Sequence, residues 1–75
     1  MTIDPRSGVP AYQQLAAILR ERIADGTYPR GETIASLRQL MAETGLADNT
    51  VQKAIGVLEA EGLVQPVRGR GTFVK

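Results

Sequence analysis

The fold is decided by residues 36–62, SLRQLMAETGLADNTVQKAIGVLEAEG, which contain two helical patterns with only a few residues between them. The first pattern opens on Ser36, followed three positions later by Gln39, and this capping box predicts the start of a helix. One buried stripe at helical spacing is formed by Leu37, Leu40 and Met41. Gly45 is expected to end this short helix in the left-handed conformation.

The second pattern predicts a helix over about 48–61, which Gly62 ends. Its buried stripe is expected to consist of Val51, Ala54, Ile55 and Leu58. Because Ala47 is a poor cap, Asp48 either caps this helix or lies in its first turn, and we expect the cap. Two helices joined by a short connection that begins with glycine form a helix-turn-helix arrangement.

The residues before this unit predict a further helix and a connector. Pro10 suits a first helical position, since its missing N–H group has no helical partner there, and Gly26 is a terminator. The buried stripe between them consists of Tyr12, Leu15, Ile18, Leu19 and Ile23. A tight turn over residues 29–31 then leads to residues 33–34, which are β-branched and suit a very short strand.

The pattern after the second helix changes to β-type residues, and residues 63–75 predict two strands joined by the turn RGRG. Pro66 cannot donate a ladder hydrogen bond, so its strand must lie at an edge or be bulged. A basic hairpin directly after a helix-turn-helix forms a wing. The predicted fold is mainly α with a small β-hairpin: a winged helix-turn-helix with three helices and a short two- to three-stranded antiparallel sheet. It covers residues 10–75 and follows a flexible N-terminal arm, residues 1–9.

Length and composition argue against several classes of function. The 75 residues form one domain at most, and 43% apolar with 23% charged residues fits a folded soluble domain. The chain has no cysteine and no histidine, so we expect no metal site, no cofactor and no catalytic centre. No apolar run approaches the roughly 20 residues that span a bilayer, and the N-terminus lacks a signal-peptide core. The expected compartment is the cytoplasm, with association to the nucleoid when DNA is bound.

The distribution of charge says more than the net charge of +1. Residues 36–61 carry two basic and four acidic side chains, whereas residues 62–75 carry three basic side chains and no acidic one. A local basic patch matters more to a polyanion than the sum over the whole chain. The charge distribution therefore indicates the C-terminal hairpin as the segment that contacts nucleic acid.

The predicted face of the helix over 48–61 that points away from the core is polar. Its candidate reading residues are Asn49, Gln52 and Lys53, with Thr50 on the flank and Asp48 at the front. Asparagine and glutamine can pair bidentately with adenine, while lysine reaches guanine or a phosphate. Taken alone, such a face is more often simply solvated. The helix-turn-helix context favours a reading surface.

Three arginines provide the other candidate contacts. Arg38 lies near the start of the first helix of the pair, where a cation opposes the helix dipole unless it binds a phosphate. In the hairpin turn, Arg68 and Arg70 flank Gly69, which permits a close backbone approach to a groove. The alternative is that these arginines only add solubility.

Several motifs together resemble the DNA-binding domain of the GntR family of bacterial transcription regulators. They are PAYQQLAAILRERIADGTYPRGETI, SLRQLMAETGLADNTVQKAIGVLEAEGLV and GRGTFV, in that order over nearly the whole chain. The resemblance implies an arginine–phosphate contact at Arg38 and a wing tip at Gly69, beside Arg68 and Arg70, that reaches the minor groove. It further implies base and backbone contacts from Asn49, Thr50, Gln52 and Lys53. It also implies a repressor that binds double-stranded operator DNA, with two copies on a palindromic site.

The chain also departs from the family pattern. Many members have serine or threonine followed by arginine where this chain has Ala47 and Asp48, and often another arginine at the place of Gln52. The NTV form resembles the short YtrA-like branch of the family. Members usually carry a C-terminal domain that binds a small-molecule effector, and this segment does not encode one.

The sequence leaves one principal rival open, a winged-helix module that binds protein and not DNA. That reading requires an exposed apolar patch on the helix over 48–61, where the chain has polar residues. An enzyme fragment has less support, since no nucleophile, base and orienting partner occur together. We therefore expect sequence-specific duplex DNA binding, with this helix in the major groove and a wing over about 67–72 at the minor groove.

Overall fold

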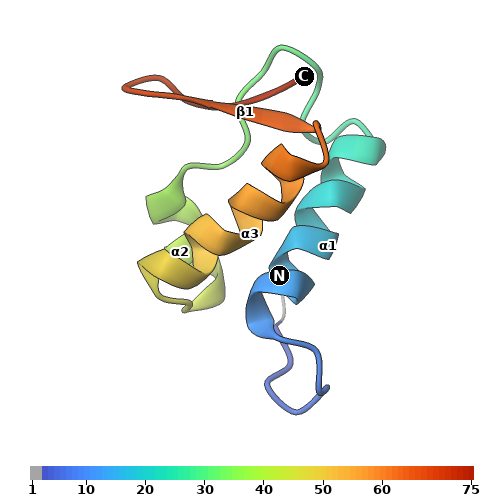
Figure 1. The fold of residues 1–75 in the computed structure, drawn as a ribbon, viewed down its shortest axis with the longest axis vertical. Helices are drawn as coiled ribbons and strands as arrows, with labels where there is room; N and C mark the ends of the chain where they lie inside the picture. The colour runs from blue at the N-terminus through green and yellow to red at the C-terminus, as the bar shows by residue number, and fades with distance from the viewer. Residues whose placement is uncertain (1–2) are drawn as a thin grey trace.

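The structure is a computed structural model, and it describes residues 3–75. The first two residues of the predicted N-terminal arm lie outside this range. The elements are α1 (Ala11–Ala24), α2 (Leu37–Thr44), α3 (Asp48–Ala60), β1 (Val64–Val67) and β2 (Gly71–Val74) (Figure 1). Three helices followed by an antiparallel hairpin confirm the predicted winged helix-turn-helix.

The start of α2 forms as its sequence predicts. Ser36 Oγ accepts a hydrogen bond from the backbone N–H of Gln39, and the Gln39 side chain accepts one from the backbone of Ser36. The helix ends at Gly45, whose φ of 72° lies in the left-handed region. Only residues 45–47 separate α2 from α3, so the turn of the helix-turn-helix is as short as expected.

The start of α3 corrects the expected cap. Ala47, and not Asp48, occupies the N-cap position in an extended conformation, and its carbonyl accepts hydrogen bonds from the N–H groups of Thr50 and Val51, each 3.1 Å long. Asp48 is the first helical residue, and its carboxylate makes no cap. Because Asp48 lies in the first turn of α3, the alternative position that the sequence left open, its charge stabilises the helix through the dipole.

The apolar core of the described residues lies between the three helices and the hairpin. Its buried residues are Leu15, Ala16, Leu19, Ile34, Leu40, Val51, Ala54, Leu58, Val64 and Val74. The predicted stripes supply most of them. Six residues of those stripes are only partly buried: Tyr12, Ile18, Ile23, Leu37, Met41 and Ile55. Ala16 was missed because an alanine gives a weak apolar signal, yet its small side chain lies buried in α1, which packs against α3. Pro10 lies at the N-cap of α1, one position before the expected place.

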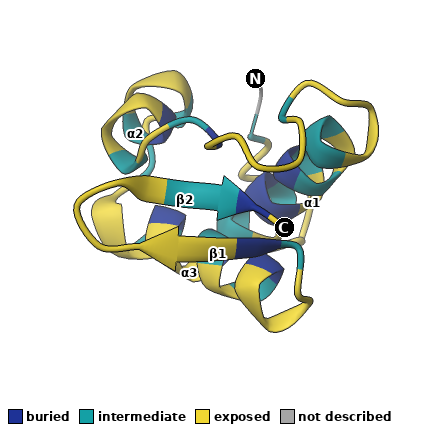
Figure 2. Ribbon diagram, turned by 90° about the horizontal axis from the view of Figure 1, so that it is seen from above, coloured by how far each residue is buried: buried dark blue, intermediate teal, exposed yellow. Residues whose placement is uncertain are grey.

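The hairpin forms a sheet with a third short segment. Val64 pairs with Val74 and Val67 with Gly71, while Thr33 forms an isolated bridge to Phe73 on the other side of β2. In the part of the chain that the structure describes, β1 is thus an edge strand, which explains why Pro66 is tolerated there. Figure 2 shows the hairpin above α3, with the exposed turn extending beyond the helices.

Side-chain contacts at two places tie other segments to this framework. Arg20 of α1 donates two hydrogen bonds to Glu61 after α3, at 2.9 and 2.8 Å. The hydrogen bond from Arg20 lowers the pKa of the Glu61 carboxyl from its usual value. Gln14 holds the N-terminal segment through hydrogen bonds to residues 4, 7 and 9. The flexibility of the arm stays a prediction.

Candidate nucleic-acid interface

A groove separates the hairpin from the two helices of the helix-turn-helix. It has a volume of about 290 Å³ and is lined by Leu37, Gln52, Ile55, Gly56, Glu59, Pro66 and Thr72. The start of α2, the exposed face of α3 and the hairpin therefore border one concave surface. We call this concavity the interface groove.

The polar residues predicted on α3 lie on the outside of the molecule. Asn49, Gln52 and Lys53 are exposed, and Thr50 is half-buried on the flank. Val51 and Ala54 between them are fully buried and fix the rotation of the helix. The predicted reading face therefore exists as a surface, although its contact with DNA stays a prediction.

Two of these side chains have partners inside the protein. The Gln52 amide nitrogen Nε2 donates a hydrogen bond to Oδ1 of Asp48, one helical turn earlier. The ammonium of Lys53 lies 4.3 Å from the ring centroid of Tyr12 on α1, in a cation–π contact. Lys53 therefore leans toward α1 and away from the interface groove, at the edge of the reading face.

Arg38 is placed to project from the beginning of α2. It is the second residue of the helix, it is exposed, and it makes no hydrogen bond or ion pair with any residue in the range 3–75. Leu37 beside it lines the interface groove. An unengaged guanidinium at the border of this groove is available to a phosphate.

The wing tip is a three-residue turn over residues 68–70. The backbone N–H of Arg70 donates to the carbonyl of Val67 at 3.0 Å, and Gly69 adopts a φ of 77°, which side chains disfavour. Arg68 and Arg70 are both exposed. The turn thus presents two guanidinium groups around a residue without a side chain.

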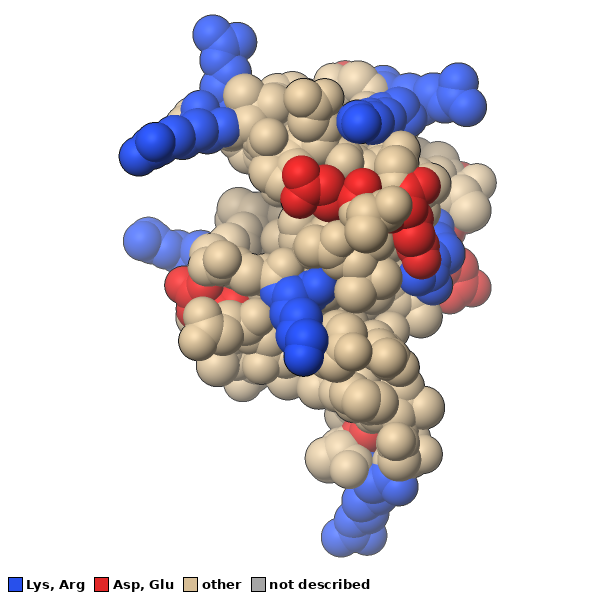
Figure 3. All heavy atoms as spheres, viewed as in Figure 1, with Lys and Arg blue, Asp and Glu red and all other residues tan. Residues whose placement is uncertain are grey.

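Charge on the visible face follows this arrangement. Figure 3, in the same view as Figure 1, shows basic side chains projecting on the left from the level of the hairpin turn and from the level of α2. A hollow lies between these two levels. A polyanionic backbone spanning the hollow would meet cations at both of its borders.

The floor of the hollow is not basic. Asp48, Gln52, Gly56 and Glu59 follow each other along α3 at helical spacing, so they lie on one ridge. Glu59 lines the interface groove next to Pro66 and Thr72. Neither Glu59 nor Tyr12 was predicted from the sequence to belong to the site. The seven-residue spacing from Gln52 could have placed Glu59 on this face, whereas the Tyr12 contact depends on how α1 crosses α3.

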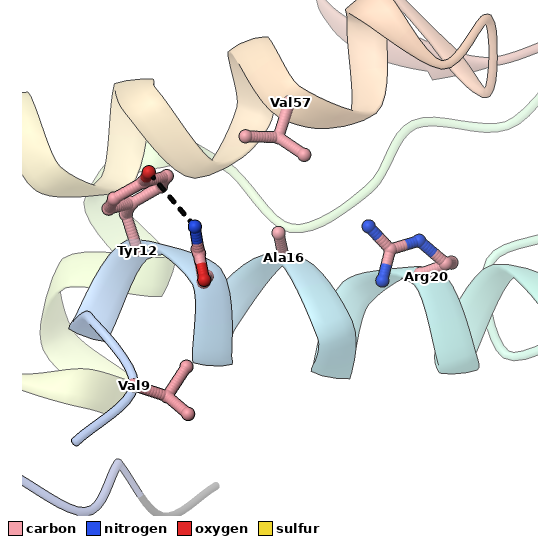
Figure 4. Close-up of a pocket in the computed structure, with 6 residues that line it drawn as sticks. Val9, Tyr12, Ala16, Arg20 and Val57 are labelled. Atoms are coloured by element: carbon pink, nitrogen blue, oxygen red, sulfur yellow. Dashed lines mark hydrogen bonds between the residues drawn. The ribbon is translucent and has the colours of Figure 1, made fainter. Parts of the chain in front are cut away.

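A second groove, shown in Figure 4, lies between α1 and α3 away from the wing. It has a volume of about 360 Å³ and is lined by Val9, Tyr12, Gln13, Ala16, Arg20 and Val57. In the close-up, Tyr12 and Val57 border one side of it and Arg20 closes one end. It contains none of the predicted DNA-contacting residues.

Within residues 3–75, no three potential metal-ligating side chains of histidine, cysteine, aspartate or glutamate come together. In the same range, no helix combines the length and the apolar character that crossing a membrane requires.

Comparison with known proteins now assigns the fold to a family. The sequence pattern of the bacterial regulatory proteins of the gntR family matches residues 11–74. The chain belongs to the GntR family. This membership confirms the resemblance that the sequence motifs indicated. The family comprises bacterial regulatory proteins, and residues 11–74 of this chain form its helix-turn-helix domain.

The similar proteins agree with this assignment. The GntR-family chain is 39% identical over 72 residues to the HTH-type transcriptional repressor YtrA of Bacillus subtilis, covering 96% of this chain. Among solved structures, the AraR DNA-binding domain in complex with operator ORX1 superposes with a TM-score of 0.93 at 32% identity, over 100% of this chain and 95% of that one. The structure of YtrA from Sulfolobus acidocaldarius superposes with a TM-score of 0.86 at 37% identity. The match covers 97% of this chain and 77% of that one.

The chain is much shorter than several of these relatives. It spans 55% of the B. subtilis repressor YtrA and 26% of the regulator Rv0792c of Mycobacterium tuberculosis, to which it is 41% identical. The comparison therefore concerns the helix-turn-helix domain, and not the parts of the relatives that lie beyond it.

Proposed function

We propose that this GntR-family domain binds a specific double-stranded operator and represses transcription from it. In this proposal α3 lies in the major groove, the wing contacts the adjacent minor groove, and Arg38 holds a phosphate between them. The domain acts by binding and not by catalysis, in the cytoplasm, and two copies occupy a palindromic site.

The single observation that carries the proposal is the interface groove with its border. Leu37, which precedes Arg38, lines this concavity together with the exposed face of α3 and with Pro66 and Thr72 of the hairpin that carries the wing arginines. Phosphate contacts position a protein on DNA and base contacts specify the sequence, so this division of residue types fits a reading site. The operator complex of the similar AraR domain gives independent support.

A nuclear magnetic resonance titration of the labelled domain with duplex DNA tests the proposal residue by residue. We expect the amide signals of Arg38, residues 48–53 and residues 68–70 to shift together. Signals from the far face of α1, for example Ala17 and Glu21, should stay in place and serve as the internal control. Shifts confined to α1, or no shifts with any duplex, would refute the assigned interface.

The rival function, a protein-interaction module, has no specific observation in its favour on this face. The exposed large apolar side chains in the described range are Val9 and Val67, and neither lies on α3. A docking helix would present an apolar patch, whereas α3 presents amides and charges.

A further inference from the structure

The hydrogen bond between Gln52 and Asp48 has a consequence for which bases the domain reads. Both residues are exposed, they lie one turn apart, and they face the same side of α3. A carboxylate accepts hydrogen bonds and donates none, so the Gln52 amide must turn its nitrogen toward Asp48. The amide oxygen of Gln52 is then directed away from Asp48.

This orientation determines what the front of the helix offers to a base pair. The free oxygens are Oε1 of Gln52 and the second carboxylate oxygen of Asp48, and both are acceptors, while the second N–H of the Gln52 amide remains a donor. The donors in the major groove are the amino groups of cytosine and adenine, whereas guanine O6 and N7 and thymine O4 are acceptors. The Asp48 carboxylate therefore fits amino-bearing bases and is repelled by guanine O6 and thymine O4, and the outward Oε1 of Gln52 also fits an amino group.

No cation on the same ridge reverses this preference. The ridge continues from Gln52 through Gly56 to Glu59, which adds another acceptor. Lys53, the one lysine of α3, is held 4.3 Å from the Tyr12 ring centroid and faces α1. Arginine or lysine is the usual partner of guanine, and the ridge that faces the groove contains neither.

We propose that Asp48 is a specificity-determining residue that acts through Gln52 as well as directly. Asp48 selects a cytosine by accepting from its N4 amino group, since adenine places the acceptor N7 beside its own amino group. It also fixes the Gln52 amide, so that the neighbouring position selects adenine or cytosine. This inference rests on the proposed DNA-binding function and specifies the class of base that the site takes.

Selection of bound duplexes from a random DNA pool tests the inference when four proteins are compared. These are the parent domain, Asp48→Ala, Asp48→Asn and Gln52→Ala. Glu21→Gln serves as the control, because it removes one exposed negative charge from α1 without changing the ridge. The readout is the base frequency at each position of the enriched motif.

The parent should enrich cytosine at one position and adenine or cytosine at the next, with a preference of about 5- to 150-fold at each. Asp48→Ala should lose the cytosine preference and also broaden the neighbouring position, whereas Gln52→Ala should broaden only the neighbouring one. Asp48→Asn should move the first preference from cytosine to adenine, because asparagine pairs with adenine. The control should keep the parent motif.

The failures are distinguishable. If Asp48→Ala tightens binding to all duplexes and leaves both base preferences unchanged, Asp48 is only a repulsive charge and the inference is wrong. Absence of a G·C preference at the position that Asp48→Ala broadens would overturn it as well. If the parent domain enriches no motif, the proposed function itself fails, and the inference falls with it.

Discussion

Replacement of Arg38 by alanine gives the most quantitative test of how the domain holds DNA. Four exposed cations surround the polar face of α3: Arg38, Lys53, Arg68 and Arg70. If each neutralises one phosphate, the logarithm of the binding constant should fall with the logarithm of salt concentration at a slope of about −3.6 per bound copy. Arg38→Ala should reduce this slope to about −2.7.

These slopes predict a clear difference in measured affinity. Between 50 and 200 mM salt the parent should lose about 150-fold in affinity for a duplex, and the Arg38→Ala variant only about 40-fold. Because the contact is to the backbone, the variant should weaken binding equally for a selected duplex and for one of unrelated sequence. Fluorescence anisotropy with both duplexes, at a series of salt concentrations, measures both effects.

The matched control is Arg30→Ala, which removes an exposed arginine from the loop between α1 and Thr33. It should keep the slope of the parent. An unchanged slope in Arg38→Ala would show that Arg38 contacts no phosphate. A loss restricted to the selected duplex would show that it reads a base.

Three further predictions follow from the core, the Arg20 contact and the ridge. Leu58→Ala should lower the free energy of unfolding by about 2–5 kcal/mol, because Leu58 is fully buried. The total for a chain of this length is about 4–11 kcal/mol. A thermal melt like that of the parent would contradict the assigned core. Arg20 lowers the pKa of Glu61, so its stabilising effect should be present above about pH 4.3 and lost as the pH falls through the folded value. Glu61→Gln should therefore lower the melting temperature at pH 7, and the difference should shrink as the medium is made acidic, whereas a pH-independent difference would refute the ion pair. Glu59→Gln should tighten binding to all duplexes, because it removes repulsion between the Glu59 carboxylate and DNA inside the interface groove. Weaker binding in anisotropy titrations would show that Glu59 instead accepts a hydrogen bond from a base.

Local rules were sufficient to predict the fold. The Ser36–Gln39 capping box, the glycine terminators and the apolar stripes act within a few residues, so the sequence displays them directly. The hairpin was predictable in the same way, since the glycine at position 69 marks the turn. The predicted cap residue of α3 was wrong, because an alanine can adopt the extended cap conformation without any side-chain hydrogen bond.

The details of the candidate site depend on contacts that local rules do not describe. Lys53 was expected to face outward with Gln52, but its position depends on the ring of Tyr12, which α1 brings near. Gln52 and Asp48 were treated as separate contacts, although their spacing of four residues on a helix allows a direct hydrogen bond. The position of Glu59 in the interface groove depends on how the hairpin folds back over α3.

Competition between two duplexes tests the central claim most directly. One duplex carries the motif enriched from a random pool, and the other carries the same bases in scrambled order; both compete for the domain at about 150 mM salt. The account predicts at least about fivefold tighter binding to the enriched duplex, because one good base contact alone contributes about 1–3 kcal/mol. Equal affinity for the two duplexes would contradict sequence-specific reading by α3.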